Sequence, residues 1–152
     1  MFGDNPMNDI VLISGGFDPV HSGHINLIKN AGSYGDVVVL LNSDNWLQSK
    51  KGKEFLPFNE RKIIMLGLKN VIDVIDFDDS NLTCVEGIKK ALKKYDNRVI
   101  KFANGGDRNS NSTPGEEFKF CTKHNIEMLW GIGGNNKSNS SSWILEKWSK
   151  KN

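Results

Sequence analysis

The run Val37 to Leu41 constrains the fold of this chain more than any other stretch. All of its residues are apolar and most are β-branched, so it predicts a short strand that is covered on both faces. Other apolar stretches predict further strands over residues 9–14, 71–77, 98–103 and 126–130. Helical patterns occupy residues 22–34, 59–68, 82–95, 114–124 and 143–150. Residues 42–53 are predicted as a polar segment between a strand and the next helix.

This alternation of strands and helices predicts an α/β fold. We expect a Rossmann-like open sheet of about five parallel strands with helices on both faces. A chain of 152 residues is long enough for one hydrophobic core and fits one domain. We place that domain over residues 9–152 and expect a flexible N-terminal arm over residues 1–8.

Composition excludes several classes of protein. The net charge of +2 does not suggest a nucleic-acid partner. No apolar stretch is long enough to cross a bilayer, and the first residues lack the apolar region of a signal peptide, so we expect a cytoplasmic protein with no membrane partner. Cys84 and Cys121 lie far apart in the sequence, which fits reduced thiols. Cys121 and His124 have a metal-like spacing but lack a second ligand pair, so no metal site is predicted.

The carboxyl edge of the predicted sheet is where polar and glycine-rich segments gather. They follow the first, second, fourth and fifth strands, over residues 15–24, 42–53, 105–108 and 135–142. In open α/β sheets, ligands bind outside the carboxyl ends of the strands. The sequence therefore predicts a ligand site at this edge.

The first of these segments combines a Gly-Gly turn, a helix start and two histidines. Free N–H groups and the positive dipole end of a helix N-terminus suit phosphate. Gly15 and Gly16 would let a ligand approach the backbone, and His21 and His24 would add donors that can also carry charge. Alternatively, each histidine could cap the helix or fill a core gap, while a metal site would need a third ligand. The segment does not complete G-x-G-x-x-G, and the chain contains no P-loop motif.

Basic side chains lie after the second predicted strand and near the start of the next predicted helix. The lysines are Lys50, Lys51 and Lys53. We expect at least one of them to contact phosphate, although a solvated loop is the alternative. Arg61 near a helix start opposes the helix dipole, which suggests an anionic partner, or else a salt bridge with Glu54 or Glu60.

Two further segments, residues 105–108 and 140–142, fit either a purely structural role or a role in ligand binding. Residues 105–108 form at least a turn, and their double glycine would allow a ligand to approach while Asp107 accepts from a base or ribose. Residues 140–142 are three serines that at least cap a helix, and with Lys137 they predict a second anion site.

Residues 15–24 resemble the hallmark G-x-F-D-x-x-H-x-G-H of the cytidylyltransferase-like nucleotidyltransferase superfamily. The matching positions are Gly15, Phe17, Asp18, His21, Gly23 and His24. The likeness runs from about residue 9 to residue 149. Class I aminoacyl-tRNA synthetases share H-x-G-H but are far longer and carry a lysine-rich signature and an anticodon-binding region, for which this chain has no room.

The resemblance is strongest to two small branches, glycerol-3-phosphate cytidylyltransferase and the adenylyltransferase domain that makes ADP-heptose. Both branches carry an Asn/Ser-x-Asp motif with a lysine segment, an arginine that opens the next helix, and Gly-Asp after the fourth strand. Their counterparts here are Asn42-Ser43-Asp44, Lys50 to Lys53, Arg61 and Gly106-Asp107. The cytidylyltransferase branch ends in R-T-x-G-I-S-T-T, whereas residues 135–142 contain no arginine. CTP and ATP therefore both stay open.

The resemblance implies transfer of a nucleotidyl group from CTP or ATP to a phosphorylated small metabolite, a sugar phosphate or polyol phosphate, with release of pyrophosphate. It assigns the catalytic positions to His21, His24, Lys50, Lys51, Lys53 and Arg61. The implied nucleotide-binding positions are Gly15, Gly16, Phe17, Asp18, Gly23, Gly106, Asp107, Arg108, Lys137, Ser140, Ser141 and Ser142. Asp44 and Arg61 would bind the acceptor, Mg²⁺ would accompany the triphosphate, and a homodimer is expected. A non-catalytic nucleotide sensor on the same fold is the alternative.

Overall fold

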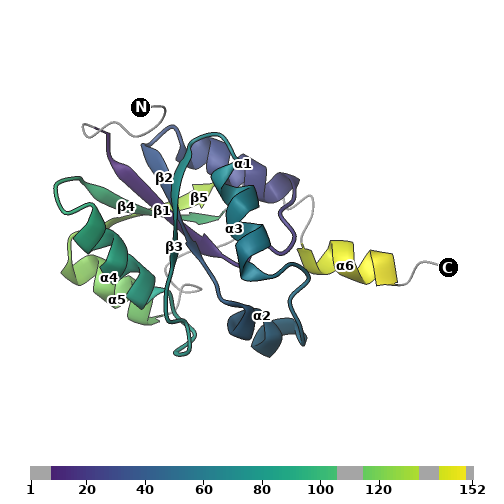
Figure 1. Ribbon diagram of the computed structural model, residues 1–152. Helices are drawn as coiled ribbons and strands as arrows, with labels where there is room; N and C mark the ends of the chain where they lie inside the picture. The colour runs from purple at the N-terminus through teal and green to yellow at the C-terminus, as the bar shows by residue number, and fades with distance from the viewer. Residues whose placement is uncertain (1–7, 106–114, 134–140, 150–152) are drawn as a thin grey trace.

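A computed structural model describes residues 8–105, 115–133 and 141–149, with no account of the side chains of residues 141–143. It contains a five-stranded sheet in the order β3-β2-β1-β4-β5, and every neighbouring pair is parallel (Figure 1). The strands are β1 (Ile10–Gly15), β2 (Asp36–Leu41), β3 (Val71–Asp76), β4 (Ile100–Gly105) and β5 (Glu127–Ile132). The predicted α/β fold is confirmed.

Helices cover both faces of the sheet. They are α1 (Ser22–Ala31), α2 (Asp44–Lys51), α3 (Phe58–Leu66), α4 (Val85–Lys94), α5 (Gly115–Lys123) and α6 (Ser141–Ser149). In Figure 1, α1 and α3 lie on one side of the sheet, and α4 and α5 lie on the other. The short helix α2 lies beyond the end of β2, and α6 extends away from the sheet (Figure 1).

Alternate residues of the central strands supply two separate cores. Val11 and Ile13 of β1 pack with Ile28 of α1 and Met65 of α3. Their neighbours along the strand, including Leu12, belong to a second cluster with residues of α4 and α5. Because side chains alternate across a strand, a strand covered on both faces has to be apolar throughout. This explains the unbroken apolar run over residues 37–41 of β2, in which every residue is buried.

Helix α2 corrects one sequence expectation, because residues 42–53 were predicted as a polar segment and contain a helix. Ser43 caps it by accepting a hydrogen bond of 3.1 Å from the N–H of Trp46. Leu47 is its one buried residue, and Gly52 follows it with a φ of +95°. Polar residues dominate α2 because only one narrow stripe meets the core, and such a stripe produces a weak apolar pattern.

Several other boundaries differ by a few residues from those expected. Helix α1 ends at Ala31 and does not continue to residue 34, and β4 continues to Gly105. Helix α4 begins at Val85 and not at Leu82, because Leu82 has a φ of +66°, which a helix cannot contain. Asn8, assigned to the arm, donates a hydrogen bond to Asp36, so it is attached to the domain, while residues 1–7 lie outside the described part. Among the described helices, none is long and apolar enough to cross a membrane.

Candidate active site at the carboxyl edge of the sheet

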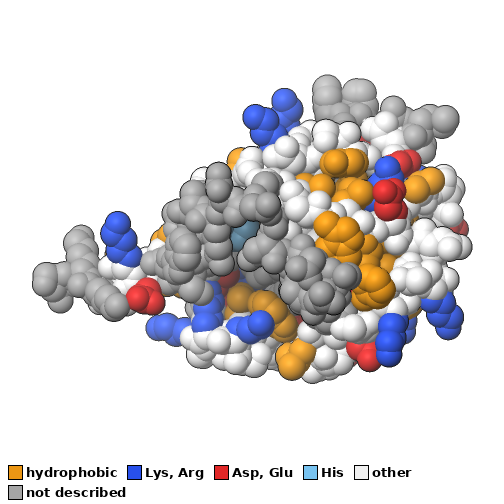
Figure 2. Space-filling model, turned by 180° about the vertical axis from the view of Figure 1, so that it is seen from behind, with side chains coloured by type: hydrophobic (Ala, Val, Ile, Leu, Met, Phe, Trp, Pro, Cys, Tyr) orange, Lys and Arg blue, Asp and Glu red, His pale blue; other side chains and the backbone are white. Residues whose placement is uncertain are grey.

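The order of the strands reverses between β1 and β4. The chain moves outward from β1 through β2 to β3, and then returns to the other side of β1 for β4 and β5. At such a switch point the two flanking connections leave on opposite faces, which opens a crevice at the carboxyl ends. The β1–α1 turn, with both histidines, therefore lies at the position where this class of sheet binds ligands. A histidine side chain is visible on the face of the molecule seen in Figure 2.

His21 and His24 form a capping box at the N-terminus of α1. The Nδ1 atom of His21 accepts from the N–H of Gly23 at 3.0 Å, and Nδ1 of His24 accepts from the N–H of His21 at 3.2 Å. The two rings stack with their centroids 3.8 Å apart. Since each Nδ1 accepts a hydrogen bond, the neutral rings carry their proton on Nε2. The capping role and the donor role, which the sequence left as alternatives, are thus compatible in one arrangement.

The charge of His24 differs from the sequence expectation. Burial, together with the adjacent His21, lowers the pKa of His24 from its ordinary 6.5 to about 3. Burial acts in this direction because a charged imidazolium loses solvation. His24 is therefore neutral at physiological pH, and it can offer an N–H donor without a formal charge.

Packing within the protein leaves little room for a side chain at the glycines of the turn. A Cβ on Gly16 would lie 2.7 Å from Cδ2 of Leu47, and one on Gly15 would lie 3.1 Å from the ring of Phe17. Gly16 thus allows α2 to pack against the turn, in addition to any approach by a ligand. Phe17 is buried with a φ of +49°, and its ring meets that of His24 edge-on at 4.7 Å. A positive φ is strained for a bulky residue, and such strain is typical of functional turns.

Asp18 anchors the segment after α2 to the turn. Its carboxylate accepts from the N–H groups of Phe55 and Leu56, both at 2.6 Å. Lys51 lies 2.9 Å from the same carboxylate and also donates to the carbonyl of Asp18 at 2.6 Å. The side chain of Asp18 is 1% exposed and that of Lys51 is 23% exposed. The ion pair therefore brings one cation to the edge of the turn.

The structure separates the three lysines that the sequence grouped. Lys51 is the one held against the β1–α1 turn. The ammonium of Lys50 lies 5.0 Å from the ring centroid of Trp46, and Lys53 is exposed beyond the end of α2.

Arg61 is buried and takes a partner that the sequence did not indicate. Its guanidinium lies 2.6 Å from Asp44, not against Glu54 or Glu60. Its other N–H groups donate to the carbonyls of Gly16, Asn42 and Leu56 at 2.8–3.0 Å. Arg61 thus joins the ends of β1 and β2 to the start of α3. The side chain of Arg61 is fully buried, so direct contact with a ligand would require the surrounding segments to move.

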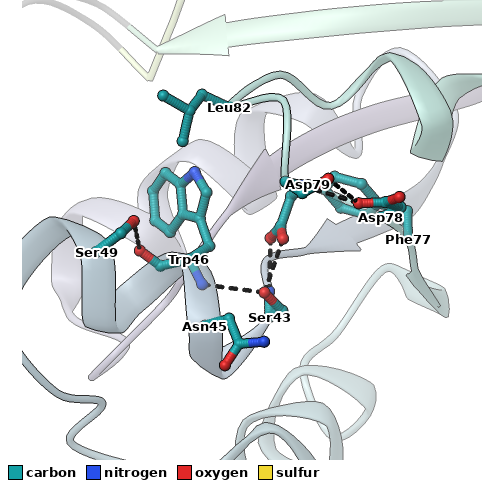
Figure 3. Close-up of a pocket in the computed structure, with 9 residues that line it drawn as sticks. Ser43, Asn45, Trp46, Ser49, Phe77, Asp78, Asp79 and Leu82 are labelled. Carbon is teal, nitrogen blue, oxygen red and sulfur yellow. Dashed lines mark hydrogen bonds between the residues drawn. The ribbon is translucent and has the colours of Figure 1, made fainter.

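Asp79 is a site-forming residue that the sequence did not single out. Its carboxylate accepts from Nδ2 of Asn42 at 3.0 Å, and from the N–H and Oγ of Ser43 at 2.8 and 2.7 Å. It is 6% exposed and lies beside a pocket of about 380 Å³ between α2 and the loop after β3 (Figure 3). The same rule that located the other polar segments applies to residues 78–80, because they directly follow β3.

Several predicted site residues lie outside the described part of the chain. These are Gly106, Asp107, Arg108, Lys137 and Ser140, with Ser141 and Ser142 described only as the backbone start of α6. Just before them, Asn104 is 2% exposed at the end of β4, and its Nδ2 donates to the carbonyl of Leu129 at 3.3 Å.

Within the described residues, no group of three or more His, Cys, Asp or Glu side chains is placed to hold a metal ion. Cys121, which has a metal-like spacing to His124, is fully buried, and burial raises its pKa to about 11. A buried thiol of that pKa is a poor metal ligand, since the thiolate is the form that binds metals.

The chain is similar to known proteins over most of its length. A family model described as cytidylyltransferase-like matches residues 12–143. The bifunctional protein HldE of Geobacter metallireducens is 31% identical over 140 residues, which is 90% of this chain and 27% of that protein. HldE of Helicobacter hepaticus is 31% identical over 120 residues, or 76% of this chain and 23% of that protein. The chain thus spans about a quarter of the length of these curated relatives.

Two solved structures share the fold. A lipopolysaccharide core biosynthesis protein from Thermoplasma volcanium has a TM-score of 0.60 at 21% identity, covering 82% of this chain and 94% of that one. A putative nicotinate-nucleotide adenylyltransferase from Vibrio parahaemolyticus has a TM-score of 0.52 at 19% identity, covering 92% of this chain and 80% of that one.

Proposed function

This chain belongs to the cytidylyltransferase-like family of nucleotidyltransferases, and on that basis we propose that it activates a phosphorylated small metabolite. An oxygen of the metabolite's phosphate attacks the α-phosphorus of CTP or ATP. The bond from the α-phosphorus to the bridging oxygen breaks, and pyrophosphate leaves with the electron pair. The product is a CDP- or ADP-linked metabolite. The observation that carries the proposal is the start of α1 at the switch point of the sheet, where Nδ1 of His21 and of His24 each accept a backbone N–H.

This reaction requires positioning and charge stabilisation more than proton transfer, because the attacking phosphate is already an anion. His21 and His24 would donate to the triphosphate, and their donors would be preorganised because each ring is fixed through Nδ1. Neutral His24 loses little solvation when it donates to an anion in a buried site. We expect these contacts to strengthen as charge develops on the leaving pyrophosphate.

Lys51 is the cation that we assign to the phosphates. It is partly exposed beside the turn, and its ion pair with Asp18 sets its position. Arg61 and Asp44 are assigned to shaping the acceptor side, because their contacts join three segments of the edge. Phe17, Gly15, Gly16 and Gly23 would form the wall of the nucleotide site, and the segments around Asp107 and Ser141 would complete it.

Mg²⁺ would enter the site together with the triphosphate. The carboxylates nearest the turn, Asp18 and Asp44, are already engaged by Lys51 and Arg61. They are therefore poorly suited to form a protein cage, and phosphate oxygens would supply most ligands of the ion. When bound, Mg²⁺ would neutralise charge on the phosphates. A homodimer stays part of the proposal on family grounds.

Pyrophosphate release tests the proposal directly. The protein is assayed with CTP and with ATP against sugar phosphates, polyol phosphates and phosphorylated amines. Release that depends on one nucleotide and one acceptor class is the expected result. Tight binding of a nucleotide with no release for any acceptor would contradict it and favour a nucleotide sensor.

A further inference from the structure

The pocket beside Asp79 lies at the same edge of the sheet as the β1–α1 turn. Helix α2 forms one wall with Ser43, Asn45, Trp46 and Ser49, and the loop after β3 forms the other with residues 77–80 and Leu82 (Figure 3). Its volume is about 380 Å³. Small-molecule pockets commonly measure about 300–1,000 Å³, so this one is suited to a compact ligand.

Trp46 connects this pocket with the phosphate-binding turn. Atom Cζ3 of its ring lies 3.5 Å from the point where a Cβ of Gly16 would stand. The indole therefore lies near the turn and also lines the pocket. A phosphorylated ligand could place its carbon skeleton in the pocket and its phosphate towards the turn.

Carboxylate and hydroxyl oxygens make up most of the polar wall of the pocket, which also contains the amide of Asn45 and the indole N–H of Trp46. The hydroxyl protons of Ser43, Ser49 and Ser80 are donated to Asp79, the carbonyl of Trp46 and Asp78, respectively. Hydrogen bonds from Ser80 also lower the pKa of Asp78, which is therefore ionised at neutral pH. What these residues present to a ligand is thus oxygen lone pairs. Such a wall suits a ligand rich in donors, either a polyhydroxyl compound or an ammonium ion.

Lys50 favours the polyhydroxyl compound. Its ammonium lies 5.0 Å from the ring centroid of Trp46, so a cation already interacts with this ring. A second cation against the same indole would be repelled by the first, whereas the C–H face of a sugar would not.

Leu82 adds an apolar rim to the pocket. Its side chain lines the pocket together with the indole of Trp46 (Figure 3). Leu82 is 65% exposed and has a φ of +66°, a strained conformation for leucine. Exposure of an apolar side chain to water and a positive φ at leucine are both energetically unfavourable. Contact with a bound ligand would explain why Leu82 adopts this position.

We propose that the Trp46 pocket binds the hydroxyl-bearing skeleton of the acceptor and that the acceptor is a sugar phosphate. This inference rests on the proposed function, since it names the acceptor of that reaction. Asp78 and Asp79 accept from the sugar hydroxyls, Trp46 stacks on the sugar ring, and Leu82 covers its outer face. The phosphate of the sugar then lies towards the β1–α1 turn and Lys51.

The test follows the indole N–H signal of Trp46 by nitrogen–proton NMR, with the signal assigned from Trp46→Phe. Pentose, hexose and heptose phosphates, glycerol 3-phosphate and phosphocholine are titrated with and without an unreactive analogue of CTP or ATP. We expect a sugar phosphate to shift this signal with saturation and to bind at least about tenfold more tightly than the other two compounds. Preferred binding of phosphocholine or glycerol 3-phosphate, or no shift with any compound, would overturn the proposal.

Pocket variants supply the second arm. Asp78→Asn removes the charge of an exposed acceptor, and Leu82→Gly removes the rim side chain while relieving the strained φ. Both should weaken binding of the sugar phosphate roughly tenfold and leave the affinity for the nucleotide unchanged. Asp96→Asn, an exposed acid in the turn between α4 and β4, is the matched control and should behave as wild type. Equal sugar-phosphate affinity in all three variants would overturn the assignment of the pocket.

Pyrophosphate release measured in parallel distinguishes the two proposals. Sugar-phosphate binding at Trp46 without release would refute the proposed function and leave the pocket assignment in place. If pyrophosphate is released with a sugar phosphate and neither Asp78→Asn nor Leu82→Gly affects that release, the proposed function would be supported and the pocket assignment refuted.

Discussion

His21 and His24 show how one pair of side chains can shape a helix start and still offer donors to a ligand. Each Nδ1 accepts a hydrogen bond from a backbone N–H, so the neutral form of each ring carries its proton on Nε2. Burial keeps His24 neutral. At the scale of residues, the site therefore depends on fixed tautomers as much as on charge.

Replacing His24 by alanine should reduce turnover by roughly 100-fold or more, because a preorganised transition-state donor is lost. The same loss is expected for His21→Ala. The measurement is the steady-state rate of pyrophosphate release by variants whose fold is confirmed by circular dichroism. His124→Ala removes an exposed histidine between α5 and β5 and should keep the wild-type rate. A folded His24→Ala protein with near-normal turnover would refute the proposed role.

The lowered pKa of His24 should make stability depend on pH. Between pH 6.5 and about 3, the unfolded chain binds a proton at His24 that the folded chain does not bind. Acid therefore favours unfolding over this range, by up to about 1.4 kcal/mol of unfolding free energy per pH unit. Above pH 6.5 this contribution is constant. His24→Gln keeps an acceptor for the N–H of His21 and cannot titrate, so its unfolding free energy should fall less steeply with acid than that of wild type in urea titrations. Parallel pH profiles would contradict the assignment.

Lys51 should matter more than its neighbours. Lys51→Met removes the cation beside the turn and should lower kcat/KM roughly 10- to 100-fold, as loss of a charge-assisted hydrogen bond does. Lys53→Met is the matched control, because Lys53 is exposed beyond α2, and it should have little effect. Similar losses in both variants would show that the lysines act as a diffuse cationic field.

Helix α2 is the element that builds most of the edge. It contributes Leu47 to the packing against Gly16, Trp46 to the pocket and Lys51 to the turn. Its start is held by Ser43, which caps Trp46 and bonds Asp79. Because α2 buries little apolar surface of its own, these polar contacts at its start decide where it lies.

Removing the cap should therefore loosen α2. Ser43→Ala is expected to lower the unfolding free energy by about 1–2 kcal/mol, because it deletes the cap and leaves Asp79 with fewer donors. Ser49→Ala, in the exposed last turns of the same helix, should change it by less than about 0.5 kcal/mol. Urea unfolding followed by circular dichroism measures both variants, and equal stabilities would contradict this role for Ser43.

Across the whole molecule, Arg61 connects segments that meet only in the folded chain. It bonds the turn after β1, the end of β2, the loop before α3 and Asp44 of α2. Its own side chain is fully buried. A buried guanidinium with this many partners makes the site and the fold interdependent.

Arg61→Met should destabilise the whole domain by about 3 kcal/mol or more, since buried carbonyls lose their donors. Asp44→Asn removes one charge from a partly exposed partner and should cost less than about 1.5 kcal/mol. Denaturant unfolding measures both. If Arg61→Met keeps wild-type stability but loses activity, then Arg61 contacts the substrate directly and the structural role is wrong.

The sequence by itself determined the parallel sheet with helices on both faces, and it predicted the edge at which a ligand site is expected. Apolar runs and helical periodicity are local properties, so β2 and α4 could be predicted from neighbours in the chain. The histidine pair was found in the same way, because both residues belong to one helix start. Helix α2 was missed, since its apolar stripe is narrow.

Only the tertiary structure decided which polar side chains meet at that edge. It placed Lys51 against Asp18, paired Arg61 with Asp44, and joined Asp79 to Ser43 across 36 positions of sequence. Such pairs depend on how separate strands end beside one another, and burial decides their protonation and partners. No local pattern contains that information, because each partner sees the other only after the chain has folded.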